Sequence, residues 1–306
     1  MQIEVTREYS CGKLMNNGTS NDASLQHHAV RVNGIRIHYV TEGKGLPVVL
    51  LHGWPQTWFQ WRKIMPILSE HYTVVAPDLR GYGDSDKPRD GYDKRTMASD
   101  IRELMHHLGY DQYYMIGHDR GARVAHRYAL DSPSNITKLA ILDILPTRFM
   151  FENVSKEMAT AYWHWFFNLV PELPELLVSS NIKAFLTHVY RSLSFNPAFL
   201  TDNEVEEYVR AYSLPGSLKA GFDDYRAAAR EDLELDTKDA GRKLEVPLLL
   251  LWGGEGGLVR QYPVLEVWRN YAVDPVGEAI PACGHFLPEE QPGIVAQKLL
   301  AFLKKK

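Results

Sequence analysis

Residues 113–121 read Tyr-Tyr-Met-Ile-Gly-His-Asp-Arg-Gly. The first four residues are apolar or aromatic without alternation, which is typical of a parallel strand covered on both faces. Gly117 and Gly121 then flank Asp119, and small residues at those positions let a strand turn sharply into a helix while one side chain stays exposed. The pattern predicts a nucleophile at Asp119. The alternative is that Asp119 only caps the helix, since aspartate is favoured at helix starts.

Short apolar strands and amphipathic helices alternate on both sides of this run. Upstream, Asn33-Gly34 joins two alternating segments and predicts a hairpin, and apolar runs at 47–51 and 73–76 predict parallel strands. Downstream, residues 139–142 and 246–251 predict two more strands, and a final helix is expected near the carboxyl terminus. The alternation predicts an α/β fold with a mostly parallel sheet.

Between Pro146 and about Asp232 the strand pattern stops and the sequence becomes helical and rich in aromatic residues. We therefore expect a helical cap at 147–232, inserted into an α/β core formed by 28–146 and 233–306. The first 27 residues are polar and predict a flexible arm without a signal peptide or anchor.

Composition excludes several classes of function. The chain has 34 Lys plus Arg against 38 Asp plus Glu, a formal charge of −4, and lacks a basic run, so nucleic acid is not an expected partner. It also lacks a run of 18 apolar residues, so we expect no membrane span and a cytoplasmic protein. The two cysteines, Cys11 and Cys283, are far apart and are expected to be free thiols.

Candidate partners of Asp119 follow it in the chain. His285, in the run Cys-Gly-His-Phe-Leu-Pro at 283–288, comes after the last sheet segment and is the candidate general base. Asp143 ends the strand at 139–142 and is the candidate that orients this histidine, with Glu255 as the fallback. The backbone N–H groups of Trp54 and Arg120 are placed to form an oxyanion hole.

A carboxylate nucleophile favours one class of reaction. Attack on an alkyl carbon gives an ester to the enzyme that water can open, so alkyl halides and epoxides are the expected substrates. Neither a metal nor an organic cofactor is expected.

The residues at this point resemble the fluoroacetate dehalogenases, in the epoxide hydrolase and haloalkane dehalogenase branch of the α/β-hydrolases, over about residues 30–303. The run that distinguishes fluoroacetate dehalogenases from haloalkane dehalogenases is His-Asp-Arg-Gly-Ala-Arg at 118–123. The resemblance implies an eight-stranded, mostly parallel sheet, and it implies that Arg120 and Arg123 hold the carboxylate of a small 2-halo acid such as fluoroacetate. It further implies that His164, Trp165 and Tyr225 bind the departing halide and that the chain can form a homodimer. The alternatives are surface ion pairs for the arginines and simple packing for the aromatic residues.

Two other functions compete with the dehalogenase hypothesis. An epoxide hydrolase would share Asp119 and His285 and use cap tyrosines as proton donors, with candidates Tyr162, Tyr190, Tyr208, Tyr212 and Tyr225. A receptor for a small acid would bind without turnover, but such receptors usually have a damaged triad.

Overall fold

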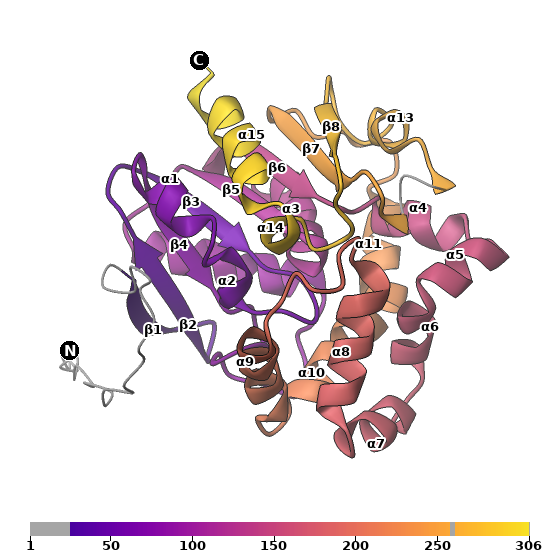
Figure 1. The fold of residues 1–306 in the computed structure, drawn as a ribbon. Coiled ribbons are helices and arrows are strands. Elements are labelled where there is room, and N and C mark those ends of the chain that lie inside the picture. Colours follow the sequence, from indigo (N-terminus) through magenta and orange to yellow (C-terminus); the bar gives the residue numbers. More distant parts are fainter. Residues whose placement is uncertain (1–24, 258–260, 306) are drawn as a thin grey trace.

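The computed structural model describes residues 25–257 and 261–305, and an eight-stranded sheet forms its centre (Figure 1). The strand order is β1-β2-β4-β3-β5-β6-β7-β8. The first two pairings in this order are antiparallel and all the others are parallel. The strands are β1 (Gln26–Val32), β2 (Ile35–Glu42), β3 (Leu46–Leu51), β4 (Tyr72–Pro77), β5 (Tyr113–His118), β6 (Ile136–Leu142), β7 (Leu248–Gly253) and β8 (Val276–Ile280). The predicted eight-stranded, mostly parallel sheet is confirmed.

The amino-terminal hairpin is also confirmed. Val32 of β1 pairs with Ile35 of β2, and the two residues between them, Asn33 and Gly34, have φ values of 46° and 78°. Positive φ at both central residues is what a type I′ turn requires. Strand β1 starts at Gln26, so the last residues of the predicted arm at 1–27 belong to the sheet, while 1–24 lie outside the described residues.

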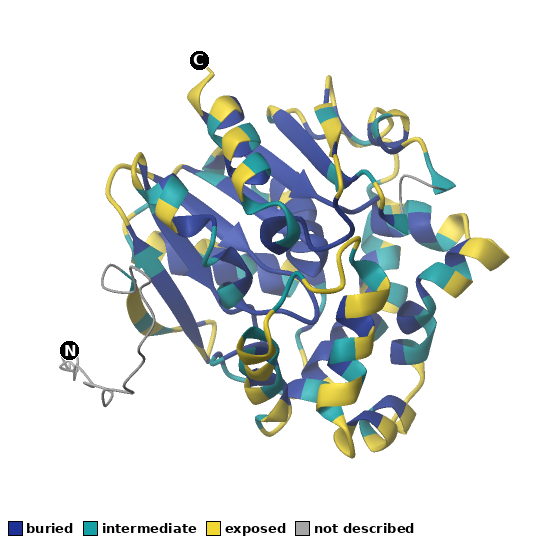
Figure 2. Cartoon of the chain, in the orientation of Figure 1, coloured by how far each residue is buried: buried dark blue, intermediate teal, exposed yellow. Residues whose placement is uncertain are grey.

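Alternate residues of β3 pack on opposite faces of the sheet. Val49 and Leu51 belong to one apolar cluster, Val48 and Leu50 to another, and all four side chains are fully buried. Each such side chain stabilises the fold by about 1.5–3 kcal/mol through burial. The interior strands are buried, as their dark colour in Figure 2 shows and as the absence of alternation predicted.

Two groups of helices cover the sheet. Residues of α2 and α3 pack in the cluster with Val49, and residues of α1 and α15 pack in the cluster with Val48. The predicted final helix is α15, and its apolar face is buried. These elements are α1 (Met65–Ser69), α2 (Lys94–His107), α3 (Asp119–Asp131) and α15 (Pro292–Lys304). The other helices of the core are η1 (Trp58–Trp61), α13 (Val264–Trp268) and α14 (Leu287–Glu290).

Between β6 and β7 the chain forms helices alone, which lie together at one end of the sheet (Figure 1). These are α4 (Thr147–Glu152), α5 (Lys156–Ala161), α6 (Trp163–Leu169), α7 (Leu173–Ser179), α8 (Ile182–Leu193), α9 (Asp202–Ser213), α10 (Ser217–Ala227), the π-helical segment η3 (Ala228–Asp232) and α11 (Leu233–Lys238). The helical run 217–238 crosses the boundary expected at 232. None of the helices in the described part of the chain has the length and apolar character needed to cross a bilayer.

Candidate active site

Asp119 sits at the turn between β5 and α3 in a strained conformation, with φ of 46°. The flanking glycines are required by space: a Cβ at Gly121 would lie 2.4 Å from the carbonyl oxygen of His52, and one at Gly117 would lie 2.6 Å from Cα of Ala122. Positive φ at a non-glycine residue is costly and concentrates at functional sites. The side chain of Asp119 does not cap α3, because its Oδ1 accepts a hydrogen bond from the Trp54 amide at 2.9 Å.

The structure brings the three candidate catalytic side chains together. His285 Nδ1 donates to Asp143 Oδ2 at 2.6 Å, and its Nε2 lies 3.7 Å from Asp119 Oδ2. Asp143 is held in turn by the Gly253 amide, which donates to Oδ1 at 2.9 Å. Asp143 therefore occupies the orienting position, while Glu255 is an exposed residue. The 3.7 Å gap places the imidazole beside Asp119 without a direct hydrogen bond between them.

Charges inside the site favour an ionised nucleophile. Burial opposes ionisation of Asp119, but His285 and other nearby positive or donor groups bring its pKa below the ordinary value. Burial also disfavours a protonated His285, yet its hydrogen bond and charge interaction with Asp143 raise its pKa above 6.5. Asp119 is therefore ionised near neutral pH, which is the form that a carboxylate nucleophile needs.

A small cavity between core and cap opens onto this triad. Its empty volume, which includes space open to solvent, is only about 330 Å³. Besides the triad, it is lined by Trp54, Arg123, Ile144, Met150, Tyr162, His164, Trp165, Leu193 and Tyr225. The cavity therefore suits a small substrate.

Arg123 brings a positive charge into this cavity. Its Nη1 donates to the Leu145 carbonyl oxygen at 3.1 Å and to Thr147 Oγ1 at 2.9 Å, and within residues 25–257 and 261–305 no carboxylate pairs with it. Its Nε has no hydrogen-bond partner in the same residues. Burial lowers its pKa to about 10, which still leaves the guanidinium protonated at neutral pH. The charges of Asp119 and Asp236 favour the protonated guanidinium from a distance, but neither pairs with it directly. An anionic ligand beside Arg123 would therefore offset part of the cost of its burial.

Arg120 lies behind the cavity and does not line it. Its Nε donates to Asp224 Oδ1 at 3.0 Å, and its Cζ lies 4.4 Å from the ring centre of Tyr225. The structure therefore does not place both guanidiniums in the cavity, because Asp224 holds one of them. Sequence reasoning missed Asp224, whose contact with Arg120 spans 104 residues.

The three predicted halide-binding side chains all line the cavity and also pack against one another. His164 stacks on Trp54 with ring centres 5.5 Å apart, and Trp165 meets Tyr225 at 5.9 Å. Burial lowers the pKa of His164 to about 3 and raises that of Tyr225 well above 10, so the first is neutral and the second keeps its proton. The Tyr225 hydroxyl has no hydrogen-bond partner in the described chain. Tyr225 therefore has an available donor group and lines the same cavity as the triad.

Comparison with known proteins identifies the family. The family described as "alpha/beta hydrolase fold" matches residues 47–292. The chain belongs to this family and is a hydrolase. The soluble epoxide hydrolase of Corynebacterium sp. (strain C12) is 43% identical over 282 residues, covering 91% of this chain and 97% of that protein. The fluoroacetate dehalogenase of Burkholderia sp. is 38% identical over 286 residues, covering 91% and 94%. The solved structure of ALR0039 from Nostoc sp. PCC 7120 has a TM-score of 0.91 and 45% identity, covering 93% and 99%.

Sequence reasoning about this hydrolase also missed a carboxylate that holds the His285 loop. Glu290 accepts hydrogen bonds from the amides of Gly284 at 3.1 Å, Phe286 at 3.0 Å and the cap residue Phe195 at 2.8 Å. Glu290 therefore holds the loop on both sides of His285 and connects this loop to the cap. The only signal in the sequence is an acidic pair shortly after His285, at 289–290.

One group of side chains in the described chain has the spacing for a metal ion: His38, Asp78 and Asp84. Asp78 already accepts hydrogen bonds from the Trp58 amide at 2.9 Å, the Asp84 amide at 2.9 Å and His38 Nδ1 at 2.8 Å. These bonds account for its burial without an ion. None of the three residues lines the cavity that contains Asp119.

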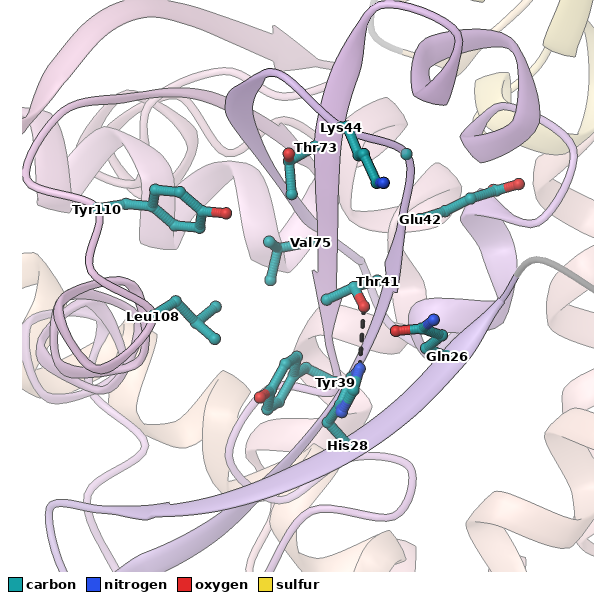
Figure 3. Close-up of a pocket in the computed structure, with 11 residues that line it drawn as sticks. Gln26, His28, Tyr39, Thr41, Glu42, Lys44, Thr73, Val75, Leu108 and Tyr110 are labelled. Atoms are coloured by element: carbon teal, nitrogen blue, oxygen red, sulfur yellow. Dashed lines mark hydrogen bonds between the residues drawn. The ribbon is translucent and has the colours of Figure 1, made fainter.

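A larger hollow lies at the edge of the sheet, where Leu108 and Tyr110 face β2 and β4 (Figure 3). Its empty volume is about 950 Å³, and within it His28 forms a hydrogen bond with Thr41 at 3.0 Å. None of the predicted site residues lines it. Size alone therefore does not single out the candidate active site of this hydrolase.

Proposed function

We propose that this hydrolase cleaves the carbon–halogen bond of small 2-halo acids and releases the 2-hydroxy acid and halide. The observation that carries the proposal is Arg123, a buried guanidinium without a carboxylate partner in the described chain, which lines the cavity that contains Asp119. A substrate carboxylate would supply the missing counterion through charge-assisted hydrogen bonds. The fluoroacetate dehalogenase among the relatives supports the same reaction class.

The first step forms an ester. Because Asp119 Oδ1 is held by the Trp54 amide, Oδ2 is the free oxygen that attacks the carbon bearing the halogen. A carbon–oxygen bond forms as the carbon–halogen bond breaks, and the halide leaves with the electron pair. The N–H and O–H groups of Trp165 and Tyr225 stabilise the charge that builds on it, with His164 as a third donor.

The second step opens the ester. His285, oriented by Asp143, takes a proton from water, and the resulting hydroxide adds to Cγ of Asp119. The amides of Trp54 and Arg120 stabilise the oxyanion, of which the first already contacts Oδ1. The 2-hydroxy acid then leaves with the proton that His285 returns. Asp119 loses the proton of the added hydroxyl to solvent, which restores its carboxylate.

Arg123→Met tests the carboxylate contact. We expect kcat/KM for chloroacetate to fall about 100-fold, because truncating one partner of a buried charge pair costs about 2–5 kcal/mol. Activity on the neutral analogue chloroacetamide should change much less, and halide release from both compounds measures the difference. Arg127→Met is the control, since Arg127 lies on the same helix and pairs with Asp131 at 3.0 Å, outside the cavity. Equal losses on both compounds would contradict the assignment.

The pH profile tests the base. His285 acts when neutral, so the rate is expected to fall as the pH drops through its folded pKa, which lies above 6.5 because of Asp143. Asp143→Asn removes the main cause of that elevation. The midpoint of the acid limb of kcat should therefore move to lower pH, on a plateau reduced by about 10⁴-fold because the imidazole loses its orientation. A midpoint that stays in place would contradict the role of Asp143.

An epoxide hydrolase is the second candidate function, favoured by the unpartnered Tyr225 hydroxyl and by the relative from Corynebacterium. Of the five tyrosines considered, only Tyr162 and Tyr225 line the cavity. Tyr190 donates to the Pro55 carbonyl oxygen, Tyr208 donates to Glu289, and Tyr212 is buried outside the cavity lining. Two protonated tyrosines could protonate the ring oxygen. Halide release from chloroacetate and fluoroacetate, compared with diol formation from styrene oxide, separates the two. Diol formation without halide release would reverse the proposal.

A further inference from the structure

A buried cluster of charges lies directly behind the cavity and takes no part in the steps above. Asp224 of α10 accepts from Arg120 Nε at 3.0 Å, from Tyr82 Oη at 2.6 Å and from the ammonium group of Lys94 at the start of α2. The side chains of Arg120 and Asp224 are fully buried, and that of Lys94 is 2% exposed. One carboxylate is thus shared between two cations.

A second carboxylate competes for Lys94. Asp232, at the end of the π-helical segment η3, accepts from the Lys94 amide through Oδ1 at 2.7 Å, and its Oδ2 lies 3.4 Å from Lys94 Nζ. A carboxylate at the start of α2 is favoured by the helix dipole, and π-helical turns recur at functional sites. These ion pairs therefore connect three elements: the turn that carries Asp119, helix α2, and helix α10, which carries Tyr225.

The charge of Arg120 can act in the cavity without touching a ligand. Its Cζ lies 4.4 Å from the ring centre of Tyr225 and 5.9 Å from that of Trp165, and both rings line the cavity. Electrostatic interactions across a buried, poorly hydrated region are screened far less than in water. The attraction that Arg120 exerts on an anion depends on how fully Asp224 cancels its charge.

We propose that Asp224 and Lys94 are positioning residues that set the positive charge presented to the cavity through Arg120. The carboxylate of Asp224 partly neutralises the charge of Arg120. Lys94 pairs with the same carboxylate and so weakens this neutralisation. The inference rests on the proposed function, in which both products are anions. A site with two uncompensated guanidiniums would bind the 2-hydroxy acid and halide tightly and release them slowly, so balanced charge allows both binding and release.

Two substitutions should shift anion binding in opposite directions. Asp224→Asn keeps the shape but removes the negative charge, so glycolate and bromide should bind about tenfold more tightly, with lower KM for chloroacetate and lower kcat. In Lys94→Met, Arg120 becomes the only cation paired with Asp224, so its charge is neutralised more fully. Glycolate and bromide should then bind about tenfold more weakly, and KM for chloroacetate should rise. Titration calorimetry gives the dissociation constants.

Asp100→Asn provides the matched control. Asp100 also lies on α2 in a buried pair, 2.7 Å from Arg80 Nε, but neither residue lines the cavity. This variant should lose stability while glycolate binding stays as in the wild type. Weaker binding in both test variants would show loss of packing alone and overturn the inference.

Tyr82→Phe keeps the test decisive if Asp224→Asn does not fold. Loss of the Tyr82 hydroxyl frees Asp224 to pair more strongly with Arg120, so anion binding should weaken by a smaller factor than in Lys94→Met. Unchanged binding in both variants would overturn the inference. A wild-type protein that binds neither glycolate nor bromide would instead reject the proposed function itself, before any variant is compared.

Discussion

Asp119→Asn is expected to abolish turnover, with kcat/KM for chloroacetate falling by at least about 10⁴-fold. The amide is isosteric but is a poor nucleophile, so the ester cannot form. Halide release measures the loss, and the thermal unfolding midpoint checks that the fold survives. Asp131→Asn is the matched control, because Asp131 ends the same helix in a surface pair with Arg95 and should not affect turnover. Activity within tenfold of the wild type would reject Asp119 as the nucleophile.

His285→Gln should stop the reaction after its first half. Alkylation of Asp119 needs no base, so each active site should release one halide and then stall, with steady-state kcat reduced by about 10⁴-fold. Rapid-mixing measurement of halide gives the burst, and the protein mass should rise by one carboxymethyl group.

His126→Gln controls for loss of a buried histidine. His126 lies on α3 against Trp268, with ring centres 5.3 Å apart and away from the cavity, so this variant should turn over normally. A slow His285→Gln enzyme without a burst would mean that the histidine acts in the first step.

Local signals made the sheet and the turn that carries Asp119 predictable. The apolar run before Asp119, the flanking glycines and the Asn33-Gly34 turn each depend on a few neighbouring residues, and the structure confirms the strand and the hairpin. Fixed chain order then led to His285 and Asp143, which the structure places in contact at 2.6 Å. The backbone geometry of these turns is set by steric contacts between neighbouring residues, so it can be predicted from a short stretch of sequence.

The surroundings of the triad were not predictable in the same way. Asp224 meets Arg120 across 104 residues and Glu290 meets Phe195 across 95, and neither contact has a local pattern. For this reason the resemblance predicted both arginines beside the substrate. In the structure, Arg123 lines the cavity, whereas Arg120 lies behind Tyr225. Buried polar contacts of this kind depend on how the cap packs on the core.

Single turnover in ¹⁸O-labelled water tests the central claim, the covalent ester to Asp119, most directly. With enzyme in excess over chloroacetate, the first glycolate released should carry no label, because its new oxygen comes from the Asp119 carboxylate. The label should appear in the peptide that contains Asp119, since water attacks Cγ and leaves its oxygen there. Labelled glycolate in the first turnover, with an unlabelled peptide, would show that water attacks the substrate carbon directly and would contradict the ester mechanism.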